Sequence, residues 1–160
     1  MTKRISIFFL TFLLAYVLPT KSIGQLSENK SDSIKVVNTM TEFINVFSNL
    51  EWDKFTAFFS DSATAFFPPS ARYPYRANNK IEIEEIFRKF FENTKRQKTA
   101  TPYLIIKPKD LKIQIVNSIA IVTFMLDDPG LFGRRTFILE KRNDKWLIIH
   151  LHASGVTITN

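Results

Sequence analysis

The sequence predicts an α+β domain in which helices from the first half of the chain cover one face of a curved antiparallel sheet. Two observations favour this fold class. Before residue 100, apolar residues recur every three or four positions in three segments, which is the period of a helix with one buried face. From residue 103 onward the period becomes two, and pairs of turn-forming residues separate the alternating runs, as in a meander of strands.

The first 24 residues have the features of an export signal. Lys3 and Arg4 give a positive start, residues 5–18 an apolar run, and residues 22–24 a small-residue cleavage site. The apolar run is shorter than the roughly 20 residues that span a membrane. We expect a signal peptide over residues 1–24, cleaved near Gly24 to give a periplasmic or secreted protein without a membrane anchor. An uncleaved anchor is the alternative.

The mature chain is expected to begin with a flexible leader over residues 25–30, followed by one domain over residues 31–160. Ser31 is the first of several candidate N-caps, and the apolar residues that follow keep helical spacing as far as Leu50. A second, short helix is expected over residues 51–59, because that spacing places Trp52 and two phenylalanines on one side.

The next segment predicts a strand, a loop and a third helix. The strand covers residues 61–67 and ends at a Pro-Pro pair, which cannot donate hydrogen bonds to a sheet. The loop over residues 70–78 is rich in Tyr and Arg and is a candidate lid. Asn78 or Asn79 can cap the helix, whose apolar face is expected to contain Ile83, Ile86, Phe87, Phe90 and Phe91.

The second half of the chain predicts a meander with turns at Asn117-Ser118 and Asn143-Asp144. The strand over residues 119–126 is nearly all apolar, so we expect it to be buried on both faces. The last strand also carries apolar residues on both sides, and helices can cover only one face of the sheet. A second subunit is the natural cover for the other face, which predicts a homodimer through the sheets. The other expected strands are residues 111–115, 134–141 and 145–156.

Composition excludes several classes of site. The chain has no cysteine, so disulfides, thiol catalysis and sulfur-ligated zinc are excluded. The net charge of +7 falls to +4 when Lys3, Arg4 and Lys21 leave with the signal peptide. This charge is mildly basic and no nucleic-acid-binding motif accompanies it, so a nucleic-acid partner is not expected.

Two stretches and the layout of the chain carry a family resemblance. SNLEWDKFTAFFSDSATAFFP, RRTFILEKRNDKWLIIHLHAS and the order of helices before sheet resemble the nuclear transport factor 2-like superfamily, particularly its SnoaL-like domains. The sequence is also similar to the association domain of calmodulin-dependent kinase. The resemblance implies a ketosteroid-isomerase-like cone, in which three N-terminal helices close the bent sheet around an apolar pocket, commonly as a dimer. It does not select an activity, because members include isomerases, cyclases, dehydratases, binding modules and scaffolds.

The last hairpin contains the candidate site. A two-residue turn at Asn143-Asp144 pairs Leu139 with Ile148, Phe137 with His150 and Arg135 with His152, all on one face. A bulge at the turn would shift the pairing and instead move Arg134 to face the histidines. An apolar surface with a cationic end suits an amphipathic carboxylate, because a guanidinium holds a carboxylate with two parallel hydrogen bonds. The expected ligand-binding residues are Arg135, His150, His152, Tyr73, Trp52, Trp146 and Phe137.

Three alternatives remain open at this point. Arg135 can instead pair with a helix carboxylate such as Glu42 or Glu85, with the histidines bonded to neighbouring backbone groups. The domain can be an acid/base enzyme without metal, with candidate carboxylates and donors at Asp61, Asp127, Asp128, Tyr73, Tyr75 and Tyr103. It can also be a non-catalytic homo-oligomeric assembly module. No cofactor is expected, and no metal, because no third ligand accompanies the two histidines.

Overall fold

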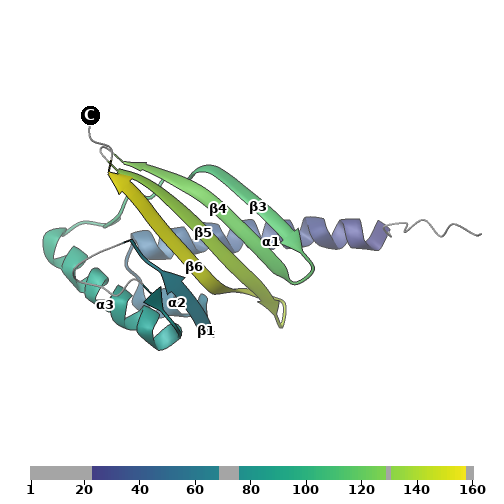
Figure 1. The fold of residues 1–160 in the computed structure, drawn as a ribbon, viewed down its shortest axis with the longest axis horizontal. Helices are drawn as coiled ribbons and strands as arrows, with labels where there is room; N and C mark the ends of the chain where they lie inside the picture. The colour runs from purple at the N-terminus through teal and green to yellow at the C-terminus, as the bar shows by residue number, and fades with distance from the viewer. Residues whose placement is uncertain (1–22, 69–75, 129–130, 158–160) are drawn as a thin grey trace, which may run out of the picture.

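The computed structural model describes residues 23–68, 76–128 and 131–157, in which helices pack on one face of a six-stranded sheet (Figure 1). The predicted α+β class is therefore confirmed. The helices are α1 (Ile23–Ser48), α2 (Trp52–Thr56) and α3 (Lys80–Gln97). The strands are β1 (Phe59–Phe66), β2 (Arg76–Ala77), β3 (Lys109–Val116), β4 (Ile119–Asp128), β5 (Leu131–Arg142) and β6 (Lys145–Thr157).

The sheet is curved and mixed, with strand order β2-β1-β6-β5-β4-β3. Strands β3 to β6 form the predicted antiparallel meander. The expectation of a wholly antiparallel sheet is wrong at one edge, because β1 runs parallel to β6 and places Thr64 opposite His150. These two residues are 86 positions apart, so the path of the chain across the domain decides their pairing, and no local turn signal predicts it.

The helices begin and end partly as expected. α1 starts at Ile23, before the expected cap at Ser31, so residues 25–30 are helical and the expectation of a flexible leader is corrected. Residues 1–22 lie outside the described residues, so the signal peptide stays a prediction. α3 is capped by Asn79 as predicted, because the Asn79 side chain accepts a 3.0 Å hydrogen bond from the backbone N–H of Glu82.

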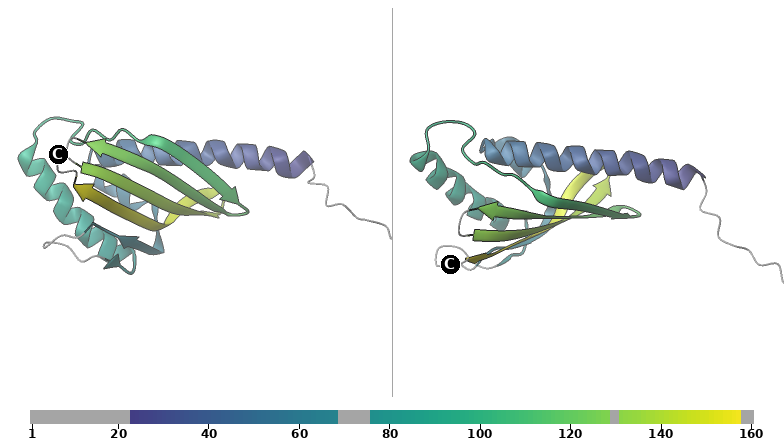
Figure 2. Two further views of the ribbon diagram at one scale, coloured as in Figure 1. Left: turned by 45° about the horizontal axis from the view of Figure 1, so that its top comes forward. Right: turned by 90° about the horizontal axis from the view of Figure 1, so that it is seen from above.

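Aromatic side chains form most of the core between the helices and the sheet. The ring of Phe43 in α1 lies 5.2 Å from that of Phe137 in β5, measured between centroids. Phe55 in α2 is fully buried, and its ring lies 4.8 Å from that of Phe87 in α3. Burial of such rings stabilises the fold by about 25 cal/mol per Å² of apolar surface, and it fixes all three helices to the same face of the sheet (Figure 2).

The opposite face of the sheet, here called the open face, has no helix over it in the described part of the chain (Figure 2). Strand β4 shows the difference between the two faces: Val122 and Phe124 are buried under the helices, whereas Ile121 and Met125 on the open face are half-buried. The expectation that this strand is buried on both faces is wrong within a single chain. The open face is therefore partly apolar and uncovered, a feature typical of surfaces that bind partners.

Candidate functional site

A cavity of about 370 Å³ lies between α1, α3 and the inner face of β4 to β6, close to the ends of β4 and β6. Its walls are mainly phenylalanine and aliphatic side chains. They arise where the inward faces of α1 and α3 diverge from the sheet, so that their rings border a space. The described lining residues are Phe43, Ile44, Phe47, Phe67, Pro68, Ile86, Phe87, Phe90, Ile106, Phe124, Leu126, Arg135, Phe137, Leu151 and Ala153.

Among these described lining residues, Arg135 alone carries a charge. Its Nη1 donates hydrogen bonds to the backbone oxygens of Ser154 at 2.9 Å and of Arg134 at 2.8 Å, which hold the guanidinium against the ends of β5 and β6. Gly133, two residues earlier on the same face, provides the space that the guanidinium occupies. A Cβ atom at Gly133 would lie 3.1 Å from Nη1. The cavity therefore has apolar walls and one cationic end.

A β-bulge in β6 decides which residues share the face of Arg135. The pairing predicted from the turn holds for Lys141 with Trp146 and for Leu139 with Ile148. The register then shifts, because Ile138 pairs with His150 and leaves Ile149 as the extra residue. Side chains alternate between faces, so one extra residue moves every later side chain of β6 to the other face.

The predicted pairing of Arg135 with His152 is consequently wrong. Arg135 pairs with Ala153, and both residues line the cavity, whereas His152 pairs with Thr136 on the open face. The alternative register with a bulge is the better description, because it is Arg134 that shares the open face with the histidines. Phe137 lines the cavity as predicted, but it pairs with Leu151 and not with His150.

The two histidines lie on the open face of β6, beside β1 and the edge strand β2. His150 Nδ1 is 2.8 Å from the Thr64 hydroxyl oxygen. The ring of Phe66 is in contact with both imidazoles, with centroid distances of 5.7 Å to His150 and 6.1 Å to His152. Partial burial lowers the pKa of His150 below its usual value of 6.5, and the nearby charges of His152 and Arg76 lower it further.

The two predicted tryptophans, Trp52 and Trp146, are not among the described lining residues of this cavity. The ring of Trp52 lies 5.6 Å from that of Phe91, and the Arg88 guanidinium carbon lies 4.4 Å from the centre of the Trp52 ring. Trp146 is buried beneath a second, more polar groove of about 400 Å³ between α1 and the start of β6. Its Nε1 has no hydrogen-bond partner among the described residues. Tyr73 lies outside the described residues.

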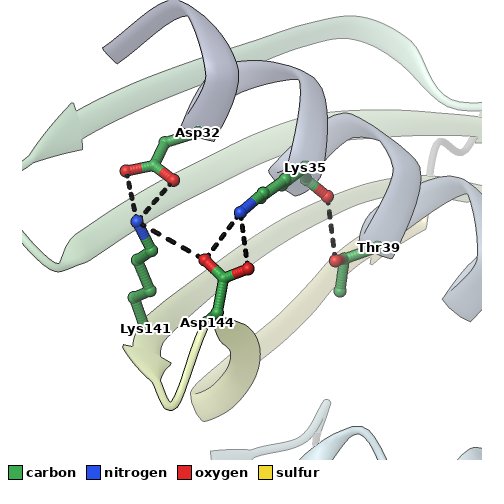
Figure 3. Close-up of polar contacts among 5 residues, drawn as sticks. All are labelled: Asp32, Lys35, Thr39, Lys141 and Asp144. Carbon is green, nitrogen blue, oxygen red and sulfur yellow. Dashed lines mark hydrogen bonds and ion pairs between the residues drawn. The ribbon is translucent and has the colours of Figure 1, made fainter. Parts of the chain in front are cut away.

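Beside this groove a network of charges joins α1 to the β5–β6 turn (Figure 3). Lys141 Nζ lies 2.8 Å from Oδ1 of the buried Asp32, and Lys35 Nζ lies 2.6 Å from Oδ1 of Asp144. The hydrogen bond from Lys35, followed by the charge of Lys35, holds the pKa of Asp144 below its usual range. Each cation is therefore matched by a carboxylate, which favours a structural role in fixing α1 to the hairpin.

Of the described phenylalanines in the cavity wall, only Phe137 is among the ligand-binding residues predicted from the sequence, and those of α1 and α3 were not singled out. The available signal was their position: Phe43 and Phe47 share one face of α1, and Phe87 and Phe90 lie on the facing side of α3. Periodicity predicts that such faces point inward, but only the spacing of the helices from the sheet decides whether they close on each other.

The comparisons with known proteins place this architecture in a family. A model of the SnoaL-like domain matches residues 36–159. The chain belongs to the SnoaL-like domain family. This SnoaL-like domain resembles an NTF2-like protein of unknown function from Pseudomonas putida, with 14% identity, 78% of this chain and 87% of that chain covered, and a TM-score of 0.64. No curated protein matches the sequence at a significant level.

Two further solved structures show how widely the fold is used. A candidate dehydratase of the NTF2-like family from Streptomyces avermitilis has 16% identity, covers 81% of this chain and 99% of its own, and gives a TM-score of 0.64. The hub homology domain of a Chlamydomonas reinhardtii CaMKII has 15% identity, covers 79% and 99%, and gives a TM-score of 0.60. At these identities the likeness shows the fold alone, so the site must supply the argument for function.

The chemistry of the site follows from its described residues. The cavity lining contains no carboxylate or imidazole among them, so the groups for proton transfer are not in its described wall. No three His, Cys, Asp or Glu side chains of the described residues are grouped to hold a metal ion. Within the described residues no helix is long and apolar enough to cross a membrane. The arrangement is best suited to holding an apolar body with an anionic end.

Proposed function

We propose that this SnoaL-like domain is an exported protein that binds a small amphipathic molecule, specifically an apolar carboxylate, in the aromatic cavity. The observation that carries the proposal is the guanidinium of Arg135, the one charged group among the described lining residues, at the end of a wall made largely of phenylalanine. The cavity volume of about 370 Å³ is within the roughly 300 to 1,000 Å³ typical of small-molecule sites. Its size favours a ligand of one or two rings or a short chain.

Both ends of such a ligand have a matching surface in the cavity. Phenylalanine rings exclude water and offer flat contacts, which favours burial of an apolar body. A carboxylate buried without a partner is costly, so a cation at the cavity end is needed to bind the acid in preference to a neutral analogue. Arg135 supplies this cation, and an arginine suits a carboxylate better than a lysine because its N–H groups match the two oxygens.

The proposal includes export and self-association. Export is supported by the positively charged and apolar start of the chain and by the cleavage site near Gly24. A homodimer through the open face is supported by its half-buried apolar side chains, among them Ile121, Met125 and Ile138. The likeness to a CaMKII hub homology domain also supports a second candidate role, that of a non-catalytic assembly module.

An acid/base enzyme of the SnoaL-like type is less well supported. The dehydratase likeness is to the fold, and the described wall of this cavity offers no acid or base. The candidate residues Asp127, Asp128, Tyr73 and Tyr75 are not placed by the described side chains.

Thermal unfolding in the presence of apolar carboxylates and their neutral amides tests the proposal. A ligand at 100 times its dissociation constant stabilises the folded state by about 2.7 kcal/mol. We expect stabilisation by carboxylates in the parent protein and in Arg134→Gln, and its loss in Arg135→Gln. Arg134 is the matched control because it is the adjacent arginine on the opposite face. No stabilisation by any panel member would favour the assembly module instead.

A further inference from the structure

On the open face, two imidazoles, one arginine and one aromatic ring form a group on β6, β1 and β2, here called the histidine cluster: Phe66, Arg76, His150 and His152. Phe66 joins it, because its ring contacts both imidazoles and lies 5.7 Å from the Arg76 guanidinium carbon. The register across β2, β1 and β6 explains the grouping, since Arg76 pairs with Phe66 and Phe66 with His152. These two histidines are the only ones in the chain.

Among the described side chains around the histidines, the cations are not matched by carboxylates. Arg76 approaches them from β2, and its charge acts on His150. Arg134 is on the same face of β5, opposite Ser154, but its guanidinium carbon lies 5.8 Å from the centre of the Phe132 ring. Strand β1 contributes the neutral Thr64 and Phe66. Of the carboxylates whose side chains are described, the nearest along these strands are engaged elsewhere. Glu140 of β5 lies beyond Ile138 and bonds Arg142, Asp61 lies 4.0 Å from Lys80, and Glu82 accepts hydrogen bonds from Asn78.

We propose that the histidine cluster makes pairing of two copies through the open face pH-dependent, with the dimer forming when both imidazoles are neutral and dissociating when they are protonated. This inference rests on the dimer in the proposed function. A dimer with two-fold symmetry uses the same patch on both copies. Since β6 and β5 are the two central strands of the sheet, a dimer centred on the sheet brings the two histidine clusters close together.

The physical reason is that burial and like charge act in the same direction. A protonated imidazole loses its hydration when the open face is covered, and it also lies near Arg76 of its own chain and near the partner's copy of the histidine cluster. Neutral imidazoles can be buried, as His150 already is in part through its contact with Thr64. The dimer therefore binds protons more weakly than the free chain, and association must weaken as protons are added.

The pKa of His150 in the free chain gives the direction of the pH effect on the dimer and the pH range in which it occurs. The pKa of His150 is already below 6.5 because of burial, and pairing lowers it further. Association is then fully present above this pKa and is lost as the pH falls below it. Each copy contributes one His150, so a lowering of one pKa unit on pairing weakens the dimer by up to about 100-fold once both sites are titrated. Most carboxylates are still charged at a pH of about 5.5.

Sedimentation equilibrium of the full chain at a pH of about 8 and about 5.5 tests the inference. We expect the dimer dissociation constant to rise about 10-fold to 100-fold at the lower pH. The double variant His150→Asn, His152→Gln should keep one dissociation constant at both values, because it removes every histidine. Asparagine retains a hydrogen-bonding group near the position of Nδ1, and circular dichroism at both values checks that each protein is folded.

The results of this experiment distinguish the pH dependence of the dimer from the existence of the dimer. A parent dimer with the same dissociation constant at both values would overturn the pH dependence and leave the dimer. A monomer at both values would overturn both. Equal dissociation of parent and double variant would also overturn the inference. If the double variant does not fold, NMR titration of the parent imidazoles decides: their pKa values should fall with increasing protein concentration, and constant values would refute the proposal.

Discussion

Replacement of Gly133 by alanine tests how the fold positions the cation of the proposed ligand site. The added Cβ would lie 3.1 Å from Arg135 Nη1 and 3.5 Å from Leu126 Cβ. The second distance is an ordinary contact, whereas the first is a few tenths of an ångström too short. Because the guanidinium is the end of a flexible side chain, we expect it to move away while the backbone of β5 stays in place.

The expected loss of unfolding free energy follows from the two hydrogen bonds that Arg135 Nη1 donates to the backbone oxygens of Arg134 and Ser154. Each is worth about 0.5 to 1.5 kcal/mol net, so losing both costs about 1 to 3 kcal/mol of unfolding free energy. The smaller conformational freedom of alanine in the unfolded chain returns about 0.4 to 1 kcal/mol. We therefore expect Gly133→Ala to lower the unfolding free energy by about 1 kcal/mol, as measured by urea titration.

The effect on binding should be larger and selective. A hydrogen bond to a charged group is worth about 1.5 to 3 kcal/mol, so carboxylate affinity should fall about 10-fold to 150-fold while amide affinity stays unchanged. Calorimetric titration of both ligands measures this ratio. Gly155→Ala adds the same methyl group at the exposed, paired position of β6 and serves as the control. An unchanged carboxylate preference in Gly133→Ala would refute the positioning argument.

Three further predictions concern the cavity, the charge network and pH. Ala153→Leu should fill part of the cavity, so thermal unfolding should show less ligand stabilisation with the ligand-free stability changed by no more than about 1 kcal/mol; undiminished binding would place the ligand elsewhere. Asp32→Asn should cost about 3 kcal/mol in urea unfolding, because it leaves Lys141 without its buried carboxylate. Asp144→Asn should cost clearly less because that pair is exposed, and equal losses would contradict the distinction. Below pH 6.5 the unfolding free energy of the parent chain should fall relative to that of His150→Asn. The reason is that the imidazole binds protons at a higher pH in the unfolded chain than in the folded one. Parallel plots of unfolding free energy against pH for the two proteins would count against this.

The elements that depend on local chemistry could be predicted from the sequence. Asn143 and Asp144 both adopt positive φ angles, of 48° and 63°, so this pair sets the turn and the first pairs of the last hairpin. Asn79 caps α3 through an equally local contact, because its side chain accepts a hydrogen bond from the backbone N–H of Glu82. These features depend on a few neighbouring residues whose preferred backbone angles are known.

The features that require distant parts of the chain could not be predicted in the same way. The parallel pairing of β1 with β6 leaves no local signal. The bulge at Ile149 left a weak signal in the sequence. The buried residues Ile148 and Leu151 are three positions apart, which breaks the period of two. This break is hidden because Leu147 and Ile149 are also apolar. Arg135 was therefore placed correctly at the cavity, but the histidines expected beside it lie on the other face.

The central claim is that Arg135 gives the aromatic cavity its preference for an anionic ligand. The most direct test is calorimetric titration of a matched apolar carboxylate and amide into the parent protein, Arg135→Gln and Arg134→Gln. We predict that the parent and Arg134→Gln prefer the carboxylate by about 10-fold to 150-fold, and that Arg135→Gln binds both ligands equally. A preference that survives in Arg135→Gln, or binding of neither ligand by the parent, would contradict the account.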